Sequence, residues 1–238
     1  GLTNDQIKGL SSTDIGDLAD TQIAALTTAQ VALLATTQTG QLTSTQLGAL
    51  ATTQIAALTT TTFSGLDGTQ VGSFTATQVK ALTTTQLNAL STTDIGELAD
   101  TQVAALATTQ VSALSTTNLT ALNATQAGAL TATQLKSLLS TQIKALTSAD
   151  IGELADTQIA ALTSSQIGAL TTTVIGALTT TQVSALEASQ IPGLTITQLD
   201  SLSTTNIEAL TSTQANALTQ TQVQSLSDAQ VDSYLKVI

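Results

Sequence analysis

An unbroken eight-residue repeat constrains this chain more than any other feature. Leucine recurs at every eighth position from Leu2 to Leu226, with Phe74 as the single exception. A second aliphatic row follows in the sixth place of each octad, and its exceptions are Thr39, Phe63, Ala127 and Ala215. A short fixed period of this kind indicates a solenoid. We therefore expect one array of 29 octads over residues 2–233, followed by an apolar tail at residues 234–238.

Each octad carries a signal for the start of a helix. With Thr3 as the N-cap, Gln6 is the third helical residue, which is the spacing of a capping box. Leu2 before the cap and Ile7 in the fourth helical position have the spacing of a hydrophobic staple. Substitutions preserve the capping signal. Carboxylates in the Gln row are favourable near a helix start, and the residues that replace Thr in the cap row are also good N-caps. The substitutions are Asp14, Asp94 and Asp150 in the Gln row, and Ser11, Ser91, Asp67 and Asn123 in the cap row.

The period excludes one continuous helix, because the leucine row would drift by roughly 80° per octad. Short helices that each end at the next cap keep both apolar rows on one side, and they need neighbours because isolated short helices are unstable in water. A β-solenoid is the alternative, since Thr, Val and Ile favour strands. The octad lacks the strict alternation of a strand. We therefore predict an all-α solenoid of short capped helices, one per octad.

The remaining octad positions divide between the surface and the interior. The seventh position is predicted to face solvent, because it holds charged residues and the only proline. These residues are Lys8, Lys80, Lys136, Lys144, Asp200, Glu208, Asp232 and Pro192. The eighth position is mostly small, as in Ala25, Gly65 and Ala185. We expect it to line the interior and to let neighbouring coils approach closely, with the Thr rows outside.

Composition excludes several classes of function. The chain has 5 basic and 16 acidic residues and a net charge of −11, whereas a basic stripe marks a nucleic-acid binder and attracts a protein to an anionic membrane. It contains neither Cys nor His, which removes thiolate and zinc–sulfur sites and the nucleophile triad. No apolar run approaches the roughly 20 residues that span a bilayer. We expect no enzyme activity, no nucleic-acid partner and no membrane span.

Three acidic clusters raise the hypothesis of a calcium site. They share the pattern Asp-Ile-Gly-Asp/Glu-Leu-Ala-Asp and comprise Asp14, Asp17 and Asp20; Asp94, Glu97 and Asp100; and Asp150, Glu153 and Asp156. Calcium takes about six to eight oxygen ligands, often from carboxylates. The simpler interpretation is structural: the first acid fills the Gln position of the capping box, and the third follows an Ala that lacks a capping hydroxyl. We therefore predict no cofactor, with calcium as the alternative.

The Thr rows and the tail suggest two kinds of partner. Capping and solubility account for the Thr rows, and the alternative is a hydroxyl face that binds ice, a glycan or a surface. The repeat stops at Ser233 and gives way to Tyr234, Leu235, Val237 and Ile238. Because solenoid ends need caps or partners, this tail either covers the last coil or docks onto another copy. The first octad shows no comparable cap, so the N-terminal end is expected to be open. A head-to-tail contact that does not close produces a filament.

The segments ALTTTQV at residues 177–183 and ALTSSQIGAL at residues 161–170 resemble the Thr/Gln-rich octapeptide tracts of large secreted or surface-attached bacterial proteins of the adhesin type. The resemblance covers the whole chain. It implies a bacterial origin, an extracellular or cell-surface location, and a role as a stalk, spacer or self-assembling fibre. It carries over no catalytic or ligand-binding residue. The alternatives are a surface-, glycan- or ice-binding module and a calcium-stiffened adhesin segment.

Overall fold

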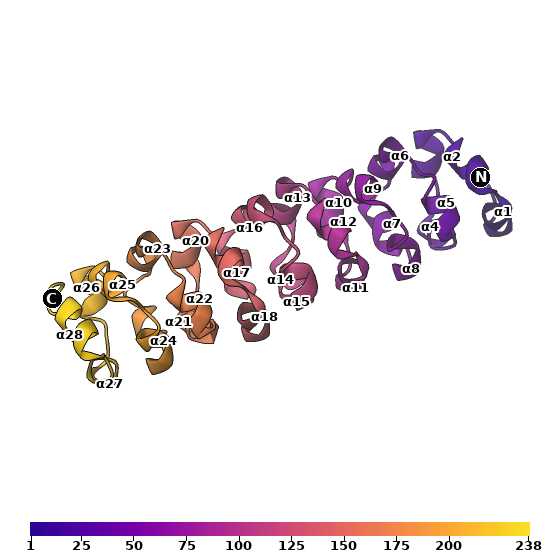
Figure 1. Ribbon diagram of the computed structural model, residues 1–238. Coiled ribbons are helices and arrows are strands. Elements are labelled where there is room, and N and C mark those ends of the chain that lie inside the picture. Colours follow the sequence, from indigo (N-terminus) through magenta and orange to yellow (C-terminus); the bar gives the residue numbers. More distant parts are fainter. The chain divides into compact units, whose positions relative to one another are not determined.

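The computed structural model describes residues 1–238, which form two compact units, Gly1–Ala129 and Leu130–Ile238. Each unit consists of short helices, one per octad, and contains no strand. The prediction of an all-α solenoid of short capped helices is confirmed, and the β-solenoid alternative is wrong. Figure 1 shows the helices of the first unit in indigo to magenta and those of the second unit in red to yellow.

The first unit contains sixteen helices. They are α1 (Asn4–Gly9), α2 (Ser12–Gly16), α3 (Asp20–Ala24), α4 (Thr28–Val31), α5 (Thr36–Thr39), α6 (Ser44–Ala49), α7 (Thr52–Ala57), α8 (Thr60–Phe63), α9 (Gly68–Gly72), α10 (Ala76–Ala81), α11 (Thr84–Ala89), α12 (Thr92–Gly96), α13 (Asp100–Ala105), α14 (Thr108–Ala113), α15 (Thr116–Leu119) and α16 (Ala124–Ala129).

The second unit continues the octad register with twelve α-helices and one 3-10 helix. They are α17 (Ala132–Ser137), α18 (Ser140–Ala145), α19 (Ser148–Gly152), α20 (Asp156–Ala161), α21 (Ser164–Ala169), α22 (Thr172–Gly176), α23 (Thr180–Ala185), η1 (Ile191–Gly193), α24 (Ile196–Asp200), α25 (Thr204–Glu208), α26 (Ser212–Ala215), α27 (Gln220–Gln224) and α28 (Asp228–Tyr234). Pro192 lies in η1 and lacks the N–H that an α-helical turn would use.

The helices begin at the predicted capping boxes. In α6, the Gln46 N–H donates to the Thr43 hydroxyl at 3.2 Å, and the Thr43 N–H donates to Gln46 Oε1 at 2.7 Å. The helix ends at Leu50, whose backbone is extended at φ −66° and ψ 134°. No residue has a positive φ, so the helices do not end through a left-handed residue. Each ends because the leucine and N-cap of the next octad require extended backbone.

Within each unit, most helices pack against the helix three octads away. Thus α10 contacts α7 and α13, and η1 takes the place of an α-helix against α21. Three octads of eight residues, 24 residues in all, therefore complete one coil. The leucine row and the Ile/Val row form the core, as shown by Ile55 and Leu58, which are 0% and 3% exposed. Both rows of the predicted staple are thus buried.

The prediction for the eighth octad position is correct in one part and wrong in another. Ala25 and Gly65 are exposed and most of the row is half-buried, as at Ala185; only Ala161 and Ser233 are buried, so the row as a whole does not line the interior. It does permit close approach, because a Cβ at Gly65 would overlap the methyl group of Thr36 in the preceding coil. The buried polar row is instead the fifth, as shown by Gln46, which is 2% exposed. The charged members of the seventh row are exposed, as predicted.

Two exceptions in the aliphatic row lie on helices that pack against each other. Thr39 on α5 and Phe63 on α8 are both fully buried, and α5 contacts α8. A small side chain in one coil is therefore followed by a large one in the next, which preserves the packed volume. The Phe63 ring also stacks on Phe74, with centroids 5.9 Å apart and planes 9° apart.

Candidate functional site

The feature that joins one coil to the next is the glutamine in the fifth octad position, which we call the glutamine clamp. At Gln86, Oε1 accepts from the Thr83 N–H at 2.9 Å, which is the capping-box bond. The other end of the same amide donates from Nε2 to the carbonyls of Ile55 and Leu58, both at 2.9 Å. These carbonyls belong to the coil below. One side chain thus starts its own helix and holds the preceding coil.

The clamp recurs throughout both units. Glutamines that donate to at least two carbonyls of the preceding coil are Gln38, Gln46, Gln54, Gln70, Gln78, Gln86, Gln102, Gln110 and Gln126 in the first unit, and Gln166, Gln190, Gln198, Gln214, Gln222 and Gln230 in the second. Each bond contributes about 0.5–1.5 kcal/mol net, and a buried carbonyl without a donor costs more.

Sequence reasoning assigned these glutamines to capping and missed their second role. A signal was present, because Glu never occupies the fifth position in this chain. A capping box accepts Glu as readily as Gln, so the strong preference for Gln in this row, in which Asp occurs only at Asp14, Asp94 and Asp150, indicates a use for the amide hydrogens. Asn118 and Asn206 keep such a bond to the preceding coil with their shorter amides. Thr62 donates only its hydroxyl, to the Leu34 carbonyl at 3.2 Å.

The first acid of each acidic cluster occupies the capping position. Asp14 accepts from the Ser11 hydroxyl at 2.7 Å and from the Ser11 N–H at 2.8 Å. The hydroxyl bond, followed by the backbone bond, lowers the pKa of the Asp14 carboxyl. Asp94 and Asp150 likewise accept a hydrogen bond from the backbone N–H of their own N-caps, Ser91 and Thr147.

The other acids of the clusters lie at helix ends. Asp20, Asp100 and Asp156 are the first residues of α3, α13 and α20, each after an alanine N-cap. Asp17, Glu97 and Glu153 are the C-cap residues of α2, α12 and α19. No three His, Cys, Asp or Glu side chains form a group suited to a metal ion. The geometry favours the capping interpretation, and calcium binding stays a hypothesis.

Along one stack of helices in the first unit, the Thr rows place two hydroxyl side chains at the start of each helix. These side chains belong to the first two residues of α2, α5, α8, α11 and α14, which pack in succession. We call this set the hydroxyl face. Its residues are Ser12, Thr13, Thr36, Thr37, Thr60, Thr61, Thr84, Thr85, Thr108 and Thr109. All are exposed except Ser12 and Thr108, which are half-buried.

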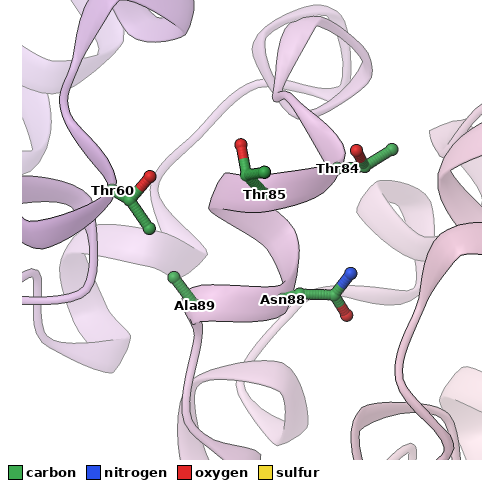
Figure 2. Close-up of a pocket in the computed structure, with 5 residues that line it drawn as sticks. All are labelled: Thr60, Thr84, Thr85, Asn88 and Ala89. Carbon is green, nitrogen blue, oxygen red and sulfur yellow. The ribbon is translucent and has the colours of Figure 1, made fainter.

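A shallow open hollow lies on the hydroxyl face between α8 and α11. Thr60 lines it from α8, and Thr84, Thr85, Asn88 and Ala89 line it from α11, as Figure 2 shows. The amide of Asn88 is held by the next coil, because it donates to the Ala113 carbonyl and accepts from the Ser115 N–H, both at 2.7 Å. The hollow is therefore uncharged and rests on fixed backbone.

The tail packs partly against its own unit. The Ser212 hydroxyl donates to the Val237 carbonyl at 2.8 Å, and Lys236 forms a salt bridge of 2.5 Å with Glu208. This pairing lowers the pKa of Glu208 and raises the pKa of Lys236. Among the residues predicted to mediate assembly, Tyr234 and Val237 are half-buried. The other two, Leu235 and Ile238, are 59% and 55% exposed.

None of the helices has both the length and the apolar content needed to cross a lipid bilayer.

In the comparison with known proteins, one family model matches part of the chain. The ALTTAQ repeat model matches residues 138–172 and 159–196, both within the second unit. No curated protein sequence matches the chain. The matched segments contain the capped octads and the glutamine clamps described above. The chain is thus a repeat protein built as a helical structural module, and residues 138–196 are similar to the ALTTAQ repeat.

Proposed function

We propose that the array is an extracellular spacer, a stalk that sets the distance between a bacterial surface and whatever it displays. The glutamine clamp is the observation that carries this proposal. It joins each coil to the one before through bonds to residues 28–31 positions upstream, as at Gln86 with Leu58 and Ile55. Because each octad repeats the same bonds, added octads lengthen a stack without changing its register.

The surface chemistry supports the same role. The exposed positions are mostly Thr, Ser and Ala, and the net charge of −11 keeps the chain soluble and discourages association. In a stack whose members contact only near neighbours, stability grows with the number of repeats. Such a stack holds its ends apart without requiring a binding site along its length.

The proposal is tested by changing the number of coils. A second copy of residues 82–105, which are three octads, is inserted after Ala105. The particle length in electron micrographs should rise by about one helix-packing distance, ~8–10 Å, per inserted coil. An insertion with the same 24 residues in scrambled order is the control. If the particles keep the same length after one such insertion and after several, the spacer function is refuted.

A second candidate is a binding module that uses the hydroxyl face. It is favoured by the two uninterrupted rows of hydroxyls on α2, α5, α8, α11 and α14 and by the hollow between Thr60 and Thr84. A glycan screen and a thermal-hysteresis measurement test it. Binding or hysteresis that is lost on changing Thr60 and Thr84 to Ala would support this candidate, and negative results in both assays would leave the spacer.

A third candidate is a subunit that assembles head to tail through the tail. The exposure of Leu235 and Ile238 favours it. The double variant Leu235→Ser and Ile238→Ser removes the apolar surface and leaves the backbone bond of Val237 to Ser212 intact. If the tail drives assembly, fibres in electron micrographs should disappear in this variant and on removal of residues 234–238. Fibres that persist would show that the tail only covers its own unit.

A further inference from the structure

The acidic octad at Asp94 leaves one contact between coils without a clamp. Asp94 lies on α12, which packs on α9. Its carboxylate accepts from the Ser91 hydroxyl at 2.7 Å and the Ser91 N–H at 3.0 Å, so the capping box is kept. A carboxylate has no hydrogen to donate, and Asp94 makes no bond to the preceding coil. At the next contact, between α10 and α13, Gln102 donates to three carbonyls.

The same contact also gathers like charges. The Glu97 carboxylate at the end of α12 lies against Gly68, the first residue of α9, where a Cβ would overlap it. The neighbouring N-cap, Asp67, carries a further carboxylate, which accepts from the Gln70 N–H at 2.8 Å. The only salt bridge in the structure is the distant pair of Lys236 and Glu208. No basic side chain forms a salt bridge at this contact.

We propose that the contact between α9 and α12 is a built-in release point, which opens before the other coil contacts of the first unit. This inference rests on the proposed spacer function, to which it adds extensibility. A folded coil occupies about one helix-packing distance, ~8–10 Å, whereas 24 extended residues reach roughly 80 Å. Extending these 24 residues also breaks the clamps of the two octads between α9 and α12, Gln78 and Gln86, and lengthens the spacer several-fold at that place. The release point also explains why Asp occupies position 94. Capping alone does not explain it, because Gln would cap the helix equally well.

Hydrogen exchange of the full chain, resolved by helix, tests the release point. In the wild type, the amides of α9 and α12 should exchange faster than those of α10 and α13. Asp94→Gln supplies the missing donor and should slow exchange in α9 and α12 by about tenfold, the effect of one to two added hydrogen bonds. Asp100→Asn is the matched control, because it also removes one negative charge and adds no clamp.

The reverse substitution locates the effect. Gln102→Asp removes the clamp at the next contact, so fast exchange should extend to α10 and α13 as well. The release point is refuted if α9 and α12 are protected as well as their neighbours in the wild type, or if Asp94→Gln slows their exchange no more than Asp100→Asn does. Failure of the spacer function would appear separately, as particle length that does not follow the number of inserted coils.

Discussion

At the scale of single residues, the chain depends on a side chain with two different hydrogen-bonding ends. The Oε1 atom of Gln46 accepts from its own N-cap, and its Nε2 donates to the Gly16 and Leu18 carbonyls at 3.0 and 2.6 Å. A carboxylate reproduces only the first of these roles. The amide is therefore the smallest group that both starts a helix and fixes the coil below.

Gln46→Glu should accordingly destabilise the first unit strongly. The carboxylate would face two carbonyls in a site that is 2% exposed, at a cost of about 2 kcal/mol or more. Gln22→Glu is the control, because Gln22 is exposed and its amide is bonded only to the Ala19 N–H. The urea midpoint should fall for Gln46→Glu and stay nearly constant for Gln22→Glu. Equal effects would show that the amide acts only as a cap.

The salt bridge of Glu208 with Lys236 predicts a local pH dependence. The pKa of Glu208 is lowered by the hydrogen bond from Lys236, so its stabilising effect is present above the ordinary Glu pKa and is lost as the pH falls through the lowered value. In Lys236→Met, an NMR titration should give a higher pKa for Glu208 than in the wild type. Global stability should hardly change, because exposed pairs contribute little. An unchanged pKa would contradict the pairing.

At the scale of the helices, glycines set the spacing between coils. Because glycine has no side chain, the backbone of one coil can approach the backbone of the next closely. A Cβ at Gly168, inside α21, would lie 2.6 Å from the Gly193 carbonyl oxygen of η1. A Cβ at Gly193 would in turn overlap the backbone and side chain of Ser164. The small seventh and eighth positions therefore determine how tightly neighbouring coils stack, even though the eighth lies largely outside the core.

Gly168→Ala and Gly152→Ala should change stability in opposite directions. Alanine is favoured over glycine inside a helix by about 0.5–1 kcal/mol, and a Cβ at Gly152 meets nothing within 4 Å. At Gly168 the clash with the Gly193 carbonyl forces η1 outward and outweighs that gain. Thermal melting of the two variants should show a higher midpoint for Gly152→Ala and a lower one for Gly168→Ala. A higher midpoint for both would mean that the coils can separate freely there.

At the scale of the whole molecule, the sequence predicted what depends on neighbours along the chain. The capping box of Thr3 with Gln6 spans three residues, and its recurrence predicted one helix per octad. The number of octads per coil depends on contacts between residues 28–31 apart, such as Gln86 with Leu58. The preference for Gln marks the donors of those contacts, but the acceptors are backbone carbonyls, which every residue has, so the sequence does not show which coil is held. The capping spacing predicted that the glutamine row caps helices, and it gave no prediction of whether that row is buried between coils.

The equivalence of the octads leads to a prediction about deletions. Removing Leu178–Ala185, one full octad, leaves every later glutamine facing an octad three places earlier, so clamps and core rows can form again. Removing only Leu178–Thr181 deletes the leucine and the N-cap of one octad and leaves its Gln182 without a cap. The later octads keep their own caps but follow the earlier ones half a period too soon, so their clamps no longer face the matching carbonyls. Circular dichroism should show helix content per residue and a melting midpoint close to wild type for the first deletion, and a clear loss of both for the second. If the two deletions are equally damaging, the second unit depends on the particular octads that stack together and not on their shared register.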